Sequence, residues 1–304
     1  MASTSKLTIK CQTKSISLPC RSHPISFEIE ELLNKIKTTA AEAASADAIC
    51  SGLSQLSRLY KCMDDLLTSS TTQVLMSREQ NKNWVDELVD ESVRFLDICG
   101  SIRDMLSEIQ GHNRELLCAL RRRKGEMSSE NCMEKYNCFR KKMKKDVKML
   151  IGSLKQVDNM INGGGGGGSV VVDSDNHQLM AVIRAVIGVS EVTILVLESL
   201  LMFFCVPVSK TNRWSLVVSK FLHKGIVACE YQQENGSGNE FQRIDAALTR
   251  LCKYGVSSEM RNVQIAQCRL DRFGAQIESM EGGLDSIFRC LVRTRVSLLN
   301  IISQ

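Results

Sequence analysis

The fold is decided by residues 82–124, which read KNWVDELVDESVRFLDICGSIRDMLSEIQGHNRELLCALRRRK. Apolar residues recur along this stretch in a seven-residue register, which consists of Leu88, Phe95, Cys99, Ile102, Leu106, Ile109, Leu116 and Leu120. Residues at that spacing share one side of an α-helix, so the stretch predicts a helix with one face in a core. As a single helix it would be about 65 Å long at ~1.5 Å per residue. Gly100 and Gly111 are the positions at which it could bend or break.

Apolar positions at helical spacing continue on both sides of this stretch. They predict helices near residues 26–44, 49–67, 130–161, 177–206, 214–222, 241–251 and 257–303. Ser45 or Asp47 would cap the second of these. The chain has three prolines in 304 residues and 5% aromatic residues, which argues against a β-sandwich or barrel. We therefore expect an all-α fold, an elongated helical bundle of about six to eight helices, several of them long with heptad-like registers. These registers would pack within the chain or between copies of it in a homo-oligomer.

Two stretches break the helical pattern and set the domain organisation. Residues 1–25 are rich in Ser, Thr and Lys and contain no acidic residue, which predicts a basic, disordered N-terminal tail. Residues 163–168 are six consecutive glycines, so residues 162–176 are expected to form a flexible loop. Because both flanks of this loop are helical in pattern, residues 26–303 are predicted to be a single helical domain.

The most apolar segment, residues 177–206, is long enough to cross a membrane. Arg184, Glu191 and Glu198 interrupt it at seven-residue spacing, so the three charges share one helical face. Charges in the middle of a bilayer are costly. The pattern therefore favours a buried bundle helix with one polar stripe, and a membrane-spanning helix is the alternative.

The net charge of +5 is unevenly distributed. Residues 1–27 carry four basic residues and no acid, and residues 120–148 carry 11 basic and 4 acidic residues, so the rest of the chain is acidic. Two clusters make up the larger basic region: Arg121, Arg122, Arg123 and Lys124, and then Arg140, Lys141, Lys142, Lys144 and Lys145. The first cluster lies where the long helix would end, and cations there complement the helix dipole. The second, with the apolar stripe on its other side, predicts a basic amphipathic helix at residues 135–148.

These nine basic residues are the candidate residues for interaction or localisation, and several interpretations of them remain open. They are a solvated outer face of the bundle, a nuclear-import signal of the K-K-x-K type, or a contact surface for an anionic membrane or an acidic protein partner. No interleaved aromatic residues accompany them, which argues against nucleic-acid binding. A second candidate is the group Arg289, Arg293 and Arg295, which would either bind acidic groups of a partner or pair with acids of the same bundle, such as Asp285.

No motif in the sequence points to catalysis, a cofactor or a metal. The glycine run contains G-x-G-x-x-G only trivially, since no strand precedes it and no helix follows directly. None of His23, His112, His177 and His223 has a histidine or cysteine at the helical spacing of a metal pair. The 13 cysteines form no C-x-x-C pair, which is typical of reduced packing residues. We expect a non-enzymatic protein with no cofactor and no metal site.

Several stretches, taken in order, resemble one known family. They are residues 17–24 (SLPCRSHP), 59–67 (LYKCMDDLL), 84–88 (WVDEL), 94–100 (RFLDICG), 120–123 (LRRR), 139–145 (FRKKMKK) and 288–301 (FRCLVRTRVSLLNI). Over roughly residues 15–303 the chain resembles the plant-specific BYPASS-related family, whose biochemical function is unknown. The resemblance implies an all-helical plant protein with a role in root and shoot development, and it supplies no catalytic residue.

Together these features predict a regulatory or scaffold protein that acts through helix-mediated contacts with protein partners. The alternative is a module that binds a membrane surface or an acidic partner through the basic helix at 135–148. The expected location is the cytoplasm, with the nucleus or a membrane surface as further compartments, since no apolar secretory signal begins the chain.

Overall fold

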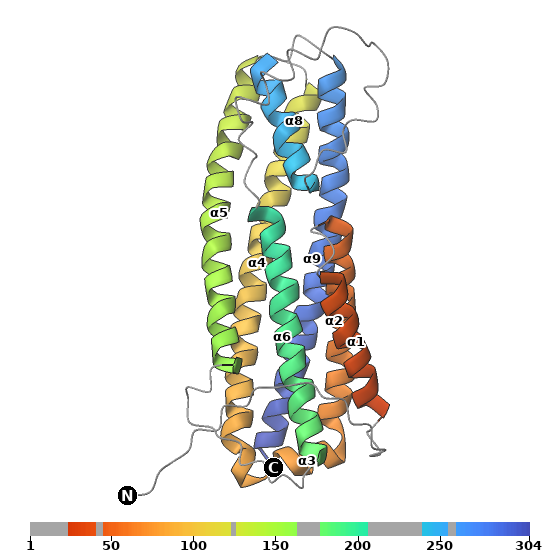
Figure 1. Ribbon diagram of the computed structural model, residues 1–304. Coiled ribbons are helices and arrows are strands. Elements are labelled where there is room, and N and C mark those ends of the chain that lie inside the picture. The colour runs from red at the N-terminus through yellow and green to blue at the C-terminus, as the bar shows by residue number, and fades with distance from the viewer. Residues whose placement is uncertain (1–23, 41–44, 123–125, 163–176, 206–238, 255–259) are drawn as a thin grey trace, which may run out of the picture.

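The computed structural model describes residues 24–40, 45–122, 126–162, 177–205, 239–254 and 260–304. In these ranges the chain forms eight α-helices, one short 3₁₀ helix and no strand, arranged as an elongated bundle (Figure 1). The α-helices are α1 (Pro24–Ala40), α2 (Ala46–Thr68), α3 (Ser70–Met76), α4 (Lys82–Arg122), α5 (Glu126–Asn162), α6 (His177–Cys205), α8 (Glu240–Tyr254) and α9 (Met260–Ile302), and the 3₁₀ helix is Glu79–Asn81. The predicted all-α bundle is confirmed.

The long helix predicted over residues 82–124 is α4, which has 41 residues. Neither Gly100 nor Gly111 interrupts it, and no neighbouring atom lies within 4 Å of a Cβ built at either position. These glycines therefore lie on an open face of a continuous helix.

The helix pair α4 and α9 runs along most of the bundle in opposite directions (Figure 1). Near one end, Nδ2 of Asn113 donates to the carbonyl oxygen of Leu270 at 3.0 Å. Near the other end, Nη1 of Arg295 donates to the carbonyl oxygen of Val89 at 3.2 Å. Close approach of α9 to α2 depends on Gly283, because a Cβ there would lie 3.0 Å from Cβ of Leu53. Contacts at both ends thus hold the antiparallel pair in register.

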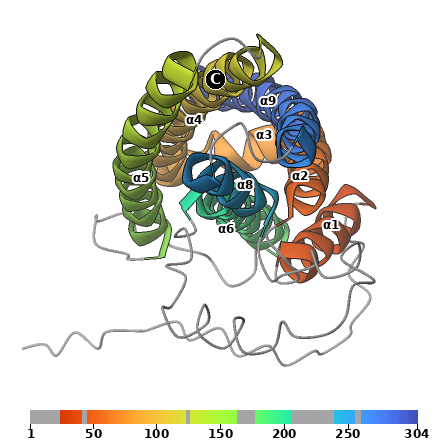
Figure 2. The same cartoon turned by 90° about the horizontal axis from the view of Figure 1, so that it is seen from above.

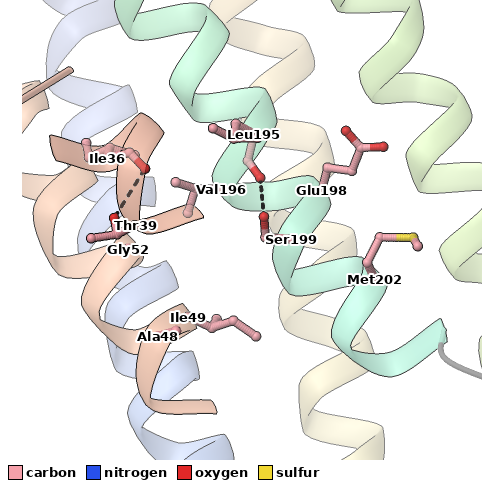
Figure 3. Close-up of a pocket in the computed structure, with 10 residues that line it drawn as sticks. All are labelled: Ile36, Thr39, Ala48, Ile49, Gly52, Leu195, Val196, Glu198, Ser199 and Met202. Carbon is pink, nitrogen blue, oxygen red and sulfur yellow. Dashed lines mark hydrogen bonds between the residues drawn. The ribbon is translucent and has the colours of Figure 1, made fainter. Parts of the chain in front are cut away.

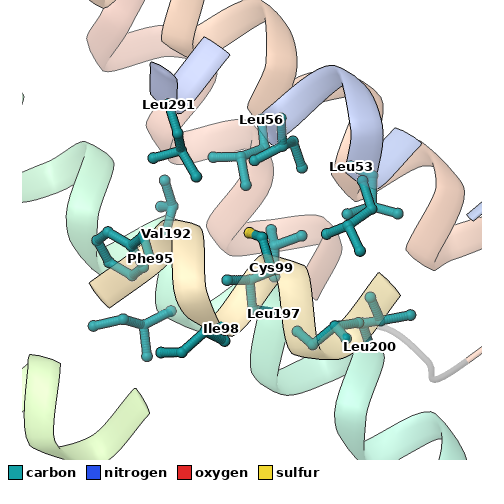
Figure 4. Close-up of a cluster of buried hydrophobic side chains, with 14 of the residues drawn as sticks. Leu53, Leu56, Phe95, Ile98, Cys99, Val192, Leu197, Leu200 and Leu291 are labelled. Carbon is teal, nitrogen blue, oxygen red and sulfur yellow. The ribbon is translucent and has the colours of Figure 1, made fainter. Parts of the chain in front are cut away.

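The most apolar segment of the sequence, α6, lies inside the bundle. Leu197, Leu200 and Phe203 are fully buried, and α6 packs on α1, α2 and α5. Figure 4 shows Val192, Leu197 and Leu200 beside side chains of α2, α4 and α9. In the described part of the chain α6 is the one helix long and apolar enough to cross a membrane, with 67% of its apolar window buried in the protein.

The polar stripe of α6 has the predicted arrangement. Arg184 is exposed, and Glu191 and Glu198 are partly exposed. Nζ of Lys37, on α1, lies 2.9 Å from Oε2 of Glu191. The stripe therefore faces the edge of the bundle and helps to hold α1 on α6.

One end of α2 shows how the sequence positions the helices. Ser45 caps α2, and its Oγ accepts a hydrogen bond from the backbone nitrogen of Ala48 at 3.1 Å. Oε2 of Glu240, at the start of α8, accepts a further hydrogen bond from the backbone nitrogen of Ala46 at 3.2 Å. Of the two caps predicted, Ser45 is the one that is formed, and the carboxylate of Glu240 satisfies a further backbone N–H at the same helix start.

Some predicted boundaries differ from the structure or lie beyond its reach. Helix α1 begins at Pro24, so the last two residues assigned to the tail 1–25 belong to a helix, and Asn162 belongs to α5. The rest of the predicted tail, the loop 163–176 and the helix at 214–222 lie outside the described residues.

Candidate interaction surface on α5

The first basic cluster lies at the end of α4 and is tied to α9. Nη2 of Arg121 lies 2.9 Å from Oδ1 and 3.2 Å from Oδ2 of Asp271. Arg122 is exposed, and Arg123 and Lys124 lie outside the described residues. Arg121 is therefore engaged in an exposed ion pair that joins two helices of the bundle, a contact of modest stability.

Arg140 is not part of an exposed basic surface, contrary to the sequence prediction. Its side chain is 7% exposed and its guanidinium pairs with the carboxylate of Asp245 on α8. Nε of Arg140 lies 3.2 Å from Oδ1 of Asp245, and Nη1 donates to the carbonyl oxygen of Phe204 at 3.1 Å. The guanidinium carbon also lies 4.0 Å from the ring centroid of Phe241. These contacts neutralise the buried guanidinium and satisfy its hydrogen bonds, so Arg140 is unavailable to a partner.

Tyr136 completes this buried group, which we call the Arg140 network (Tyr136, Arg140, Phe204, Phe241 and Asp245). The hydroxyl of Tyr136 donates to Oδ1 of Asp245 at 2.6 Å. Burial, together with the charge of Asp245, raises the pKa of Tyr136 well above its usual value, so the phenol remains protonated. One carboxylate and one guanidinium balance each other, and the network joins α5, α6 and α8.

The remaining lysines of the second cluster have different environments. Nζ of Lys142 lies 2.7 Å from Oε1 of Glu108 on α4, and this hydrogen bond raises the pKa of Lys142. Lys144 is half-buried. Lys141 and Lys145 are exposed, and neither forms an ion pair with any described residue. Of the five residues predicted here, two therefore lie free on the outer side of α5.

These two belong to a longer row that the sequence prediction missed in part. Lys148 and Lys155 are also exposed and form no ion pair within the described ranges. At about 100° per residue, Lys141, Lys145, Lys148 and Lys155 fall within an arc of about 80° and span about 21 Å of helix. We call these four residues the lysine row. Their i, i+4, i+7 spacing was visible in the sequence, but Lys148 and Lys155 lie outside the contiguous cluster.

The lysine row faces away from the core at an edge of the bundle. Helix α5 packs on α4 and α6, and both views show it as an outer helix (Figures 1 and 2). Beside the row, Met149 is 65% exposed. The outer face of α5 is therefore a basic surface with the exposed side chain of Met149 next to it.

Two hollows mark other parts of the surface. One, of about 600 Å³, lies between α4 and α5 next to the lysine row, where the rings of His112 and Phe139 are 4.3 Å apart. The other, of about 280 Å³, lies between α1, α2 and α6 (Figure 3). Its walls are mostly apolar, with Glu198 and Ser199 among its few polar residues. Of the seven candidate residues that the structure describes, none lines the second hollow, and only Lys142 lines the first.

We searched the described residues for side-chain groups that could bind a metal ion and for disulfide bonds. These residues include no group of three or more His, Cys, Asp or Glu side chains placed to bind a metal ion. Eight cysteines of the described helices are free, among them Cys99 and Cys290, which are buried, and Cys118, Cys138 and Cys268, which are exposed.

Comparison with known proteins identifies the family. A family model described as Protein BPS1 matches residues 52–301, from α2 to the last turns of α9. No curated protein matches the chain, and no solved structure matches it. The matched range includes the lysine row and the Arg140 network and covers well over half of the 304 residues. The chain therefore belongs to the BPS1 family, a BYPASS-related family, as the ordered sequence motifs indicated.

Proposed function

We propose that this protein is a non-enzymatic regulatory scaffold in plant development, which contacts an acidic protein partner through the lysine row of α5. Membership of the BPS1 family supports the developmental role. The observation that carries the contact surface is that four exposed lysines on one face of α5 have no ion-pair partner among the described residues.

Electrostatics favour this surface over the other basic residues of the predicted clusters. The charge of Arg140 is neutralised by Asp245, that of Arg121 by Asp271 and that of Lys142 by Glu108. The lysine row, in contrast, presents like charges on one helix at distances where they repel one another slightly. An acidic surface laid along α5 would relieve that repulsion and would steer the encounter over a long range at low ionic strength.

The proposal is tested by reversing three charges of the row in the variant K141E/K145E/K148E. Proximity labelling in plant tissue would compare it with the wild-type chain and with a control, K35E/K61E/K82E, which reverses three exposed lysines on α1, α2 and α4. We expect reproducible neighbours that the wild type and the control share and that the row variant loses. Identical neighbours for all three chains would rule out the lysine row as the contact surface.

A second candidate is binding to an anionic membrane surface, which the exposure of Met149 beside the lysines favours. Lysines near an anionic leaflet contribute about 1 kcal/mol each, and an exposed apolar side chain adds contact with the lipid boundary. Co-sedimentation with vesicles of phosphatidylcholine, with and without phosphatidylserine, tests it. Binding that requires phosphatidylserine, and that K141E/K145E/K148E abolishes, supports the membrane; equal recovery with both vesicle types contradicts it.

A further inference from the structure

A second surface lies on α4 and α9, on the side of the bundle away from α6 (Figure 2). On α9, Val292, Val296 and Leu299 are 42%, 50% and 40% exposed. Their spacing of four and three residues puts them on one stripe of the helix. Exposed apolar side chains that occur singly need no explanation, but a contiguous stripe indicates a contact surface.

Charges of opposite sign lie on the two sides of this apolar stripe. Arg289 and Arg293 of α9 are exposed and form no ion pair with a described residue, so the predicted pairing of Asp285 is instead with Arg103, at 3.9 Å. Asp86, Asp90 and Asp97 of α4 are likewise exposed and form no ion pair in the described ranges. Neither set of charges therefore has an ion-pair partner among the described residues of the bundle.

Three contacts of α9 with its neighbours fix the order of these stripes across the surface. Phe288 and Arg295 face α4, because Arg103 lies over the Phe288 ring and Arg295 binds the Val89 carbonyl. Ser297 faces α2, because its hydroxyl donates to Oδ1 of Asp64 at 2.8 Å. At about 100° per residue, Val292 and Leu299 then fall towards α4, whereas Arg293 falls towards α2.

On α4 the positions next to α9 are those of Arg103 and Gln110, which contact Phe288 and Glu278. Asp90 and Asp97 lie about a third of a turn away from those positions, further from α9. The order across the surface is therefore aspartates, apolar stripe, arginines. Because α4 and α9 are antiparallel, Asp97 lies at the level of Arg289 and Arg293, between the Phe288 and Arg295 contacts.

We propose that this surface, defined by Asp86, Asp90 and Asp97 of α4 and by Arg289, Val292, Arg293, Val296 and Leu299 of α9, binds a second copy of the chain. A two-fold axis that runs parallel to the helices along the apolar stripe brings stripe onto stripe. The same rotation places Asp97 opposite the partner's Arg289 and the partner's Arg293, and the reverse pair forms by symmetry. Such an isologous contact has an apolar centre and complementary charges on both flanks, which suits a homodimer.

Charge reversal tests the dimer with the full chain. The variants D90K/D97K and R289E/R293E are each expected to weaken dimerisation by roughly tenfold or more, because like charges then meet on both flanks. Sedimentation velocity over a range of protein concentrations measures this. Mixing the two variants restores both complementary flanks, so an equimolar mixture should form a heterodimer. The quadruple variant D90K/D97K/R289E/R293E should again form a homodimer.

The control is K141E/K145E, which changes α5 and should leave the dimer unaffected whether or not the lysine row binds a partner. Circular dichroism of each variant shows whether it folds, and the homodimer of the quadruple variant tests the complementary flanks without relying on the stability of either double variant alone. A wild-type chain that stays monomeric at all concentrations overturns the proposal. A dimer that persists unchanged in both charge-reversed variants overturns it as well.

Discussion

The hydroxyl of Tyr136 donates to Oδ1 of Asp245 at 2.6 Å, across 109 residues of sequence. The same carboxylate pairs with Arg140, so two side chains of α5 converge on one acid of α8. Asn239, just before α8, donates from Nδ2 to the carbonyl oxygen of Phe203 at 2.7 Å. These contacts set α8 in line with the end of α6 (Figure 1).

Removing the arginine of this network should destabilise the protein strongly. The variant Arg140→Met leaves the Asp245 carboxylate buried without its cation, and breaking a buried pair on one side costs about 3–5 kcal/mol. Urea denaturation followed by circular dichroism measures the free energy of unfolding. The double variant R140M/D245N removes both charges and should recover part of the loss. Equal free energies of unfolding for R140M and the wild type would contradict the prediction that the buried Asp245 carboxylate requires the Arg140 cation.

Two adjacent glycines of α9 should respond in opposite directions to the same substitution. A Cβ at Gly283 would lie 3.0 Å from Cβ and 3.1 Å from Cδ1 of Leu53, which is tighter than ordinary contact, so Gly283→Ala requires Leu53 or α9 to shift by a few tenths of an ångström. Overpacking of this kind costs about 1–3 kcal/mol. Nothing lies within 4 Å of a Cβ at Gly282, so Gly282→Ala should stabilise the helix by about 0.5–1 kcal/mol. Thermal unfolding compares the two; equal shifts would contradict the close approach.

The stability of the protein should fall between about pH 4.5 and pH 7 through Glu91. This buried carboxyl of α4 has its pKa raised to about 7 by burial, against a smaller opposing effect of the hydrogen bond with Ser190. In the unfolded chain Glu91 loses its proton near pH 4.5, while the folded chain keeps it until about pH 7. The unfolded state then binds fewer protons, so stability decreases with rising pH, by about 3 kcal/mol in total.

The variant Glu91→Gln cannot titrate and isolates this effect. Its free energy of unfolding, minus that of the wild type, should rise from pH 4.5 to pH 7 and level off above. Urea denaturation at a series of pH values gives this difference, in which the other carboxylates cancel. A difference that stays constant over that range would place the titration of Glu91 at its ordinary pKa.

The cap of α2 should contribute measurably to stability. Ser45→Ala removes the acceptor of the Ala48 hydrogen bond and should cost about 1 kcal/mol. Ser54→Ala, an exposed position in the interior of the same helix, serves as the control and should leave stability unchanged or slightly higher. Chemical denaturation compares the two, and equal effects would argue that Glu240 alone satisfies the start of α2.

Periodicity in the sequence predicted the long helices well, because the apolar register of α4 and α9 persists over many turns. Arg140 was assigned to the exposed cluster because it adjoins four lysines in the sequence. At about 100° per residue it falls on the side of Tyr136 rather than that of Lys141, which favours burial. Its partner Asp245 is 105 residues away, and no local pattern connects the two. Periodicity along the sequence therefore could not predict which charged residues pair across the bundle.

The position of α9 after the other helices of the bundle in chain order has a consequence for synthesis. The ribosome completes α6, with its apolar surface, more than fifty residues before it reaches the end of α9 at Ile302. Both α2 and α4 make their most extensive contacts with α9, so the core cannot close until α9 itself has been synthesised. Nascent or prematurely terminated chains would thus expose α6 to chaperones and to aggregation. A chain shortened before α9 should be cleared by proteolysis rather than accumulate as a smaller folded protein.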